Sequence, residues 1–226
     1  MNSIANRQDT DVVMTGFGAV TAYGVGTQPQ REFVERPQDL SLRPFKAGRY
    51  VSDRRMLKAV SHSDSIGLAA FESARADAGD FAACYEPERR GIYVGSPPST
   101  SSDNDNYLDA VRAARDPSGA SSVRDFGAEC MGCRPNTLLS GLPNNVLCYG
   151  ALMIDARGPN SNYTSGDLSG HLAVLNGWRR VRRGQIDFAV AGAFSAHSEP
   201  VNAAMLRQLG LTAGGVNVAD GGCFIT

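Results

Sequence analysis

Residues 158–184, GPNSNYTSGDLSGHLAVLNGWRRVRRG, carry the clearest structural pattern in the chain. Asn162, Tyr163 and Thr164 suit a β-strand, and Ser165-Gly166 is typical of a tight turn. The residues that follow predict an amphipathic helix that ends at Gly184, where a glycine C-cap is common. The apolar stripe predicted to face the core, with spacings of three and four, consists of Leu168, Leu172, Leu175, Trp178 and Val181.

A sharp strand-turn-helix connection places one residue, Asp167, at the start of this helix. Enzymes built in this way often keep their nucleophile there, beside unpaired backbone N–H groups. An aspartate suits a simpler role as N-cap, in which its carboxylate accepts backbone N–H bonds and faces the positive end of the helix dipole. We therefore expect Asp167 to cap the helix.

Composition excludes several classes of function. The chain has 226 residues, 42% of them hydrophobic, and a formal net charge of −1, so nothing in its bulk charge favours nucleic acid or an anionic membrane as partner. The first ten residues, MNSIANRQDT, have no apolar signal-peptide core, and no apolar run is long enough to span a membrane. A cytoplasmic location is the expectation.

The five cysteines are scattered, and their odd number fits reduced thiols. Cys130 and Cys133 form a single CxxC, whereas a zinc site needs two further ligands. The three histidines, His62, His171 and His197, do not have ligand spacing. We therefore expect no metal site and no redox role for the CxxC pair.

The remainder of the chain alternates strands and helices, which predicts an α/β protein with a mixed or parallel sheet covered by helices. We expect buried strands at 11–15, 89–95 and 188–192, and an irregular segment at 116–136. A dinucleotide cofactor is not expected, because Thr21 stands where the third glycine of GxGxxG would follow Gly16 and Gly18. The predicted helices are 27–36, 64–78, 107–115, 146–154 and 201–210, and another strand opens at 223–226.

Four blocks of sequence resemble the N-terminal half of the β-ketoacyl-acyl carrier protein synthase family. The more specific two, which contain LPNN and RGPN, lie in LLSGLPNNVLCYGALMIDARGPN at 138–160. The others are VVMTGFGAVTAYG at 12–24, RRGIYVGS at 89–96 and RRGQIDFAVAGAF at 182–194. They occur in family order and together cover nearly the whole chain.

The resemblance implies a thiolase-like αβαβα architecture in which residues 1–226 form a single N-terminal domain and the C-terminal half is absent. It implies condensation chemistry by a cysteine that takes an acyl group from a carrier protein. That cysteine follows the GPN block, and its place here is held by Asp167, with Gly170 matching the last glycine of the family's turn. The family's two catalytic histidines belong to the C-terminal half, and we expect His171 to be an ordinary helix-face residue. No cofactor is implied.

A thiolate at a helix N-terminus is a strong nucleophile, whereas a carboxylate there is a poor acyl carrier. The resemblance therefore favours a non-catalytic partner of an active synthase, similar to chain-length factors in polyketide or fatty-acid biosynthesis, as a dimer or heterodimer. In the family the strand before the turn pairs across the dimer axis. Its residues here are Ser161, Asn162, Tyr163, Thr164 and Ser165.

Two alternatives remain. In one, a separate chain supplies the missing half, and Asp167 serves as a base or carboxylate in a composite condensing or decarboxylating site. In the other, the chain is a scaffold that binds acyl carrier protein through a basic cluster. The same cluster is also typical of a solvated helix face, where positive charge is favourable near the helix C-terminus. The cluster consists of Arg179, Arg180, Arg182 and Arg183.

Overall fold

The computed structural model describes residues 11–26, 46–51, 53, 55–98, 104–120, 122–130, 137–212 and 219–226. The strands are β1 Phe17–Thr21, β2 Gly24–Val25, β3 Arg90–Gly95, β4 Asn160–Tyr163, β5 Phe188–Ala196 and β6 Asp220–Ile225. The α-helices are α2 His62–Ala78, α3 Asn104–Ala113, α4 Val123–Cys130, α5 Thr137–Ser140, α6 Asn145–Met153, α7 Ser169–Arg182 and α8 Pro200–Gln208. Short 3₁₀ helices are η1 Ala47–Arg49, η2 Met56–Lys58, η3 Gly79–Cys84, η4 Pro87–Arg89 and η5 Gly166–Leu168.

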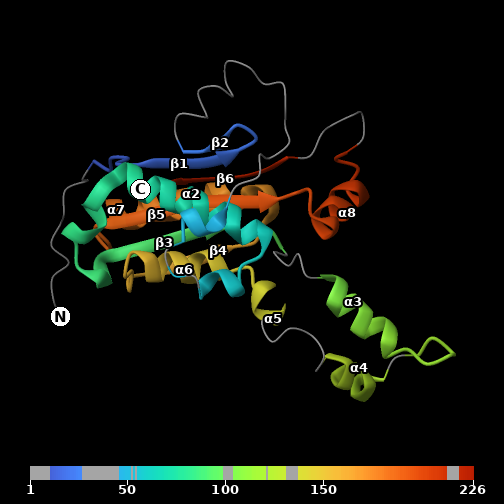
Figure 1. Cartoon of the computed structure of the whole chain (residues 1–226). Helices are drawn as coiled ribbons and strands as arrows, with labels where there is room; N and C mark the ends of the chain where they lie inside the picture. Colours follow the sequence, from blue (N-terminus) through green and yellow to red (C-terminus); the bar gives the residue numbers. More distant parts are fainter. Residues whose placement is uncertain are drawn as a thin grey trace.

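The six strands form one mixed sheet in the order β2-β1-β6-β5-β3-β4 (Figure 1). Strands β5, β3 and β4 run parallel, while β2, β1, β6 and β5 pair antiparallel along the other half. The α/β prediction with a mixed sheet is confirmed, and β3, β5 and the helices predicted from residue 64 onward lie close to their expected ranges. The helix predicted at 27–36 lies outside the described residues.

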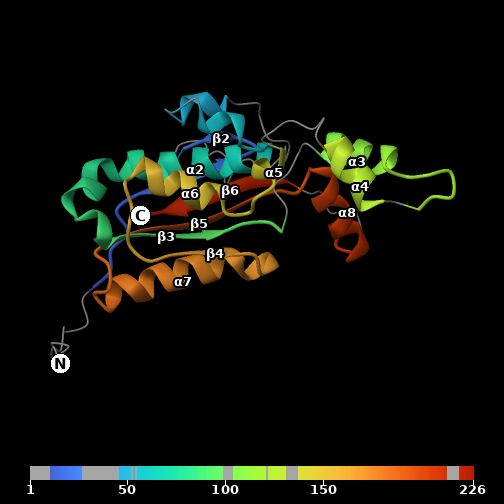
Figure 2. The ribbon, with the colours of Figure 1, turned by 90° about the horizontal axis from the view of Figure 1, so that it is seen from below.

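Helices cover both faces of the sheet (Figure 2). On one face α2 packs against β1, β5 and β6, with α6 beside it. A capping box fixes the start of α2, because the Ser61 hydroxyl accepts from the Asp64 N–H and the Asp64 carboxylate accepts from the Ser61 N–H, both at 3.0 Å. Fully buried side chains between these layers include Ile66, Phe71, Val190 and Phe224.

Two glycines, Gly16 and Gly18, allow the start of the chain to pack closely against α2. A Cβ at Gly18 would overlap the backbone of Ala74 in α2, and a Cβ at Gly16 would overlap the same turn. The close approach of the chain to α2 therefore occurs at and after Gly16, where β1 forms. The strand predicted at 11–15 is wrong, and Val13 and Met14 in that segment are 71% and 65% exposed.

Small residues attach α7 to the opposite face of the sheet. Ser169, Ala173 and Gly177 are the buried residues of this helix, and a Cβ at Gly177 would lie 3.2 Å from both Tyr93 and Ala191. Of the large apolar stripe predicted to be buried, Leu172 and Val181 are partly buried, but the other three residues are exposed. Leu168 is 64% exposed, Leu175 38% and Trp178 40%. The helix is confirmed, but the prediction of its buried face is wrong for these three residues.

Helices α3 and α4 pack against each other beside the main body (Figure 1). The prediction of an irregular segment at 116–136 is wrong for residues 123–130, which form α4, whereas residues 131–136 lie outside the described part of the chain. No helix in the described ranges is long and apolar enough to cross a membrane.

The close packing of β1 on α2 gives a direct test. We predict that Gly18→Ala lowers the free energy of unfolding by about 1–3 kcal/mol, because the added methyl must displace helix backbone. Gly127→Ala in α4 is the matched control, since no atom lies within 4 Å of its added Cβ and alanine favours helix. Urea denaturation measures both variants, and equal stability of the two would contradict this packing.

Candidate functional site

The turn between β4 and α7 is built as a sharp elbow. Strand β4 ends at Tyr163, Gly166 adopts a φ of +60° that favours glycine, and one 3₁₀ turn leads into α7. The Ser165 N–H donates to the Ser169 hydroxyl at 2.8 Å and ties the two sides of the turn together. The predicted strand-turn-helix connection is confirmed.

Asp167 lies inside this 3₁₀ turn, and its side chain is exposed. The residues at the cap positions are Ser165 for η5 and Leu168 for α7, and neither makes a side-chain capping hydrogen bond. The prediction that Asp167 caps the helix is therefore wrong, because the extra 3₁₀ turn moves the helix start beyond it. The carboxylate is left free to face the adjoining cavity.

This cavity, which we call the elbow cavity, has a volume of about 890 Å³ and lies between the start of α7, the ends of β3 and β5, and α8. Its polar lining includes Ser96, Asp167, His171, Ser195 and His197. The apolar lining residues include Val174, Leu175, Trp178, Met205, Leu206, Leu209 and Leu211. An apolar hollow with a few polar groups suits a small organic or acyl ligand.

Cys223 also lines the elbow cavity, although sequence reasoning placed no cysteine near the elbow. It is on β6 opposite Ala193 of β5, and a Cβ built on Gly170 of α7 would lie 3.0 Å from the Ala193 Cβ. Only the antiparallel β5–β6 register reveals this proximity. Burial raises the pKa of the Cys223 thiol, so this cysteine lacks the depressed pKa of an activated nucleophile.

A cluster of three carboxyl groups, one histidine and one serine lies where α2, α8 and β6 begin. This polar hub consists of His62, Asp64, Ser198, Glu199 and Asp220. His62 Nε2 lies 3.5 Å from Asp220 Oδ2, and the Ser198 N–H donates to Asp220 Oδ1 at 2.8 Å. The Glu199 side chain is buried, and its Oε1 has no hydrogen-bond partner among the described atoms. Sequence reasoning missed the hub, because its members are distant in the chain.

The hub shifts the pKa of each of its titratable groups. Burial raises the pKa of Glu199 to about 7 and that of Asp64 to about 6. The hydrogen bond with Asp220 raises the pKa of His62. Burial opposes ionisation of Asp220 as well, but the bonds from His62 and Ser198 leave its pKa lowered. Glu199 precedes the first residue of α8, so the hub anchors one wall of the elbow cavity.

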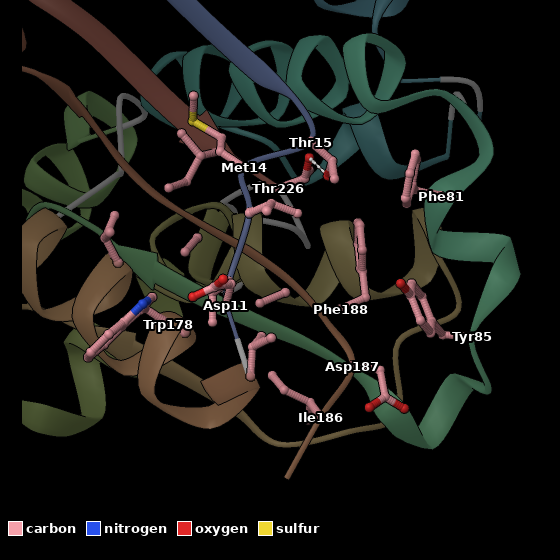
Figure 3. A pocket seen from close by; sticks show the side chains of 18 of the residues that line it. Asp11, Met14, Thr15, Phe81, Tyr85, Trp178, Ile186, Asp187, Phe188 and Thr226 are labelled. Carbon is pink, nitrogen blue, oxygen red and sulfur yellow. Dashed lines mark hydrogen bonds between the residues drawn. The ribbon is translucent and has the colours of Figure 1, made fainter. Parts of the chain in front are cut away.

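A second cavity, the strand-end cavity, has a volume of about 470 Å³ and opens farther along α7 (Figure 3). Trp178 lies on one side of it and Tyr85 and Phe188 on the other, with Asp11 between them. The Thr15 and Thr226 hydroxyls are 2.9 Å apart at its edge. Val174 and Trp178 line both cavities, so the exposed side of α7 separates the two hollows.

The predicted carrier-binding arginines lie at the C-terminal end of α7, opposite the elbow. Arg180 donates to Gln185 Oε1 at 2.9 Å, and the Arg182 guanidinium lies 5.0 Å from the Trp178 ring centroid. Arg179 and Arg183 are exposed. The cluster therefore does not adjoin the elbow turn, and its role in carrier binding stays a prediction.

The predicted dimer strand forms an edge of the sheet. Ser161, Asn162 and Tyr163 belong to β4, which pairs with β3 on one side and is the last strand in the order. Thr164 and Ser165 lie beyond the strand, so its predicted length is wrong by these two residues. Asn162 Nδ2 donates to the Ser96 hydroxyl at 2.9 Å and connects the strand end to the elbow cavity.

No group of three or more potential ligands able to hold a metal occurs in the described part of the chain. Cys130 is the last residue of α4, and Cys133 lies outside the described residues. The expectation that this CxxC pair has no metal-binding or redox role therefore stays a prediction.

The chain matches the sequence model of one protein family. The family model "Beta-ketoacyl synthase, N-terminal domain" matches residues 43–217. A comparison with curated protein sequences gives no match.

Solved structures share the fold. One is a type II polyketide synthase acyl-carrier protein in complex with its ketosynthase bound to the hexaketide (AntDE:AntF), with a TM-score of 0.76 and 17% identity. The ishigamide ketosynthase/chain length factor has a TM-score of 0.74 and 18% sequence identity. A β-ketoacyl synthase from Burkholderia phymatum STM815 has a TM-score of 0.68 and 18% sequence identity. Each match covers 94% of this chain but only 57–60% of the other chain.

The raised pKa values in the polar hub predict how stability depends on pH. A carboxyl group whose folded pKa lies above its unfolded value stabilises the protein below the unfolded pKa and loses this contribution as pH rises. We expect stability to fall between about pH 4.5 and 7, by at most about 1.4 kcal/mol per unit for Glu199, with Asp64 acting in the same direction up to about pH 6 and His62 from about pH 6.5 upward. Asp220, whose pKa is lowered, opposes this trend only in more acidic solution.

Glu199→Gln removes one of these titrations, so this variant should lose less stability than the wild type between pH 5 and 8. Glu129→Gln, at an exposed position in α4, is the control and should follow the wild type. Chemical denaturation across this pH range measures the effect. A wild-type profile that rises with pH would contradict the assignment.

Proposed function

The chain belongs to the β-ketoacyl synthase family, and we propose that it acts as a non-catalytic partner of an active synthase in fatty-acid or polyketide biosynthesis. The observation that carries the proposal is Asp167. The elbow is formed and opens to a large apolar cavity, but it presents a carboxylate at the position where the resemblance places the acyl-carrying cysteine.

The chemistry of the substitution supports inactivity. A thiol accepts an acyl group from a carrier thioester and conserves the thioester bond, because attacking and leaving atoms are both sulfur. A carboxylate would have to form a mixed anhydride, which is higher in energy and open to hydrolysis. Asp167 is exposed, so it also lacks the desolvated surroundings that usually raise the reactivity of a catalytic carboxylate.

The exposed edge of β4 supports pairing with a synthase. An edge strand presents unpaired backbone N–H and C=O groups, which another strand can bind by extending the sheet. In β4 this edge is short and uncharged, with Asn160, Ser161 and Asn162 in sequence. The resemblance places the dimer axis at this strand, and one strand added to β4 would continue the sheet.

A composite site is the second candidate, and one observation favours it. His171 and His197 line the same cavity as Asp167, so a carboxylate and two imidazoles face one apolar hollow. Such groups could assist decarboxylation of a malonyl group if another chain supplied the acyl-carrying thiol. The scaffold role is supported by the exposed Arg179 and Arg183, which could receive an acidic carrier domain.

The partner role predicts a specific pattern of hydrogen–deuterium exchange. Purification of the tagged chain from its source cell should recover a β-ketoacyl synthase with an intact elbow cysteine in equimolar amount. Adding that synthase to the free chain should slow exchange in residues 160–163, because β4 gains backbone partners. Residues 123–130 in α4 serve as the internal control. Recovery without a synthase, or unchanged exchange in β4, would contradict the proposal.

Carbon dioxide release from malonyl-loaded carrier protein separates the partner role from the composite site. We expect no release by the chain alone, and with the synthase present Asp167→Ala should give the same rate as the wild type. Release that needs both proteins and falls at least tenfold in Asp167→Ala would establish the composite site. Release by the chain alone that disappears in this variant would overturn the non-catalytic role.

A further inference from the structure

The polar hub joins three parts of the chain at the end of the sheet where α8 begins (Figure 1). These parts are the first turn of α2, the first residue of β6 and the connection from β5 to α8. On that connection, Ser198 and Glu199 belong to the hub, and they directly precede Pro200, the first residue of α8. The hub therefore fixes the point at which the chain enters α8.

Polar contacts hold this connection on the rest of the fold. The Ser198 N–H donates to Asp220 Oδ1 at 2.8 Å, and the Ser198 hydroxyl donates to the other oxygen of the same carboxylate. In the first turn of α8, Asn202 is 2% exposed, and its amide donates to the Ala196 carbonyl at 2.9 Å. The start of α8 is thus held by groups whose hydrogen bonds depend on the charges around them.

Glu199 is the weakly compensated member of this connection. Its side chain is buried within this chain, and its Oε1 has no hydrogen-bond partner among the described atoms. The Ser63 backbone N–H lies close enough to the carboxyl group to favour its charged form, but the Ser63 hydroxyl has no partner either. A buried carboxylate with so few donors is costly, whereas a protonated carboxyl is not.

The charged groups that face Glu199 come from α2 and β6. His62 of α2 favours the ionised form of Glu199, while Asp64 of α2 and Asp220 of β6 oppose it. Burial is the largest cause of the raised pKa of Glu199, which is about 7. At high pH three carboxylates therefore share this small region with one imidazole.

Two titratable groups of the neighbouring helices do not change this balance. Tyr149 of α6 adjoins Asp64, and burial raises the pKa of its hydroxyl, so it stays neutral at physiological pH. Arg207 of α8 lies eight residues after Glu199, which corresponds to about 12 Å along the helix. Neither group supplies a positive charge beside the Glu199 carboxyl.

Ionisation of Glu199 therefore favours its movement into water. As pH rises through about 7, the carboxyl loses its proton beside two other carboxylates, and exposure relieves both the desolvation and the repulsion. A folded pKa above the unfolded value means that the docked position is favoured at low pH and loses this advantage as pH rises. Because Glu199 directly precedes α8, its movement displaces the start of the helix.

The same connection reaches the elbow cavity. Ser195 and His197 line this cavity, with the Ser195 Oγ and the His197 Nδ1 3.3 Å apart, and the next two residues belong to the hub. Asn202 of α8 lines the cavity as well. A displacement at Glu199 therefore moves part of the cavity wall.

From this arrangement we propose that Glu199 is a proton-operated latch for α8. With the carboxyl neutral, the connection from β5 to α8 stays docked on α2 and β6, and with the carboxyl charged it opens into solvent. The opening is local and couples the shape of the elbow cavity to pH near neutrality. This latch does not depend on the partner role, because it consists of groups that the chain itself buries.

Two backbone amides report directly on the latch. The Ser198 N–H donates to Asp220, and the Ala203 N–H donates to the Glu199 carbonyl at 2.8 Å. Amide exchange measured by NMR gives protection factors that are corrected for the intrinsic effect of pH. Both should fall at least about tenfold between about pH 5.5 and 8, because a pKa of about 7 in the docked position returns toward 4.5 in water. Amides of α7 should stay protected, which distinguishes local opening from global unfolding.

A matched pair of variants isolates the carboxyl group. Glu199→Gln removes the titration, so its protection factors should change by no more than about threefold over this range. Glu86→Gln is the control, because Glu86 is exposed and also precedes a proline at the start of a helix, η4. Its backbone angles of −61° and 143° are close to the −64° and 140° of Glu199. Glu86→Gln should follow the wild type, and circular dichroism verifies that both variants are folded.

The carboxyl group itself can be titrated in the same samples. The ¹³C resonance of the Glu199 carboxyl, assigned by its absence in Glu199→Gln, should titrate near pH 7, together with the loss of amide protection. Protection of Ser198 and Ala203 that is independent of pH, or that falls equally in Glu199→Gln, would overturn the latch. A carboxyl midpoint below about pH 5, or a parallel loss of protection in α7, would overturn it as well.

Discussion

The close approach of α7 to the sheet is the constraint on which the site depends. Only small residues, Ser169, Ala173 and Gly177, occupy the buried side of the helix, and a Cβ on Gly177 would already lie 3.2 Å from Tyr93. Larger residues such as Leu175 and Trp178 therefore lie on the outer side. This packing turns Leu175 and Trp178 outward, and Val174 and Trp178 then line both cavities.

The elbow illustrates what local sequence can and cannot predict. The strand, the turn glycine and the helix follow from short-range chemistry, and the buried strands β3 and β5 follow from apolar runs. The buried face of α7 was predicted wrongly for Leu168, Leu175 and Trp178, because periodicity finds an apolar stripe but cannot show that small residues let the opposite face approach the sheet. Cys223 and the polar hub were missed, because the β5–β6 register and the meeting of α2, α8 and β6 join distant residues.

The surfaces have different chemistry and suit different roles. The edge of β4 offers backbone groups for sheet extension, whereas the outer side of α7 offers apolar area with opposite charges at its ends. The elbow is a strand-turn-helix connection, and the resemblance places Asp167, which cannot conserve a thioester, where the family carries its acyl-accepting cysteine. This combination of the family's fold with a carboxylate at the elbow is what our proposal of a non-catalytic partner rests on.

Trp178 is the single tryptophan of the chain, so its fluorescence reports directly on the outer side of α7. Acrylamide quenching should be measured as the protein is diluted from high micromolar to low nanomolar concentration. The structure predicts an accessible indole with red-shifted emission in the dilute, folded chain, because Trp178 is 40% exposed. An indole that stays shielded in a dilute, folded monomer would contradict this orientation of α7 and the surfaces that follow from it.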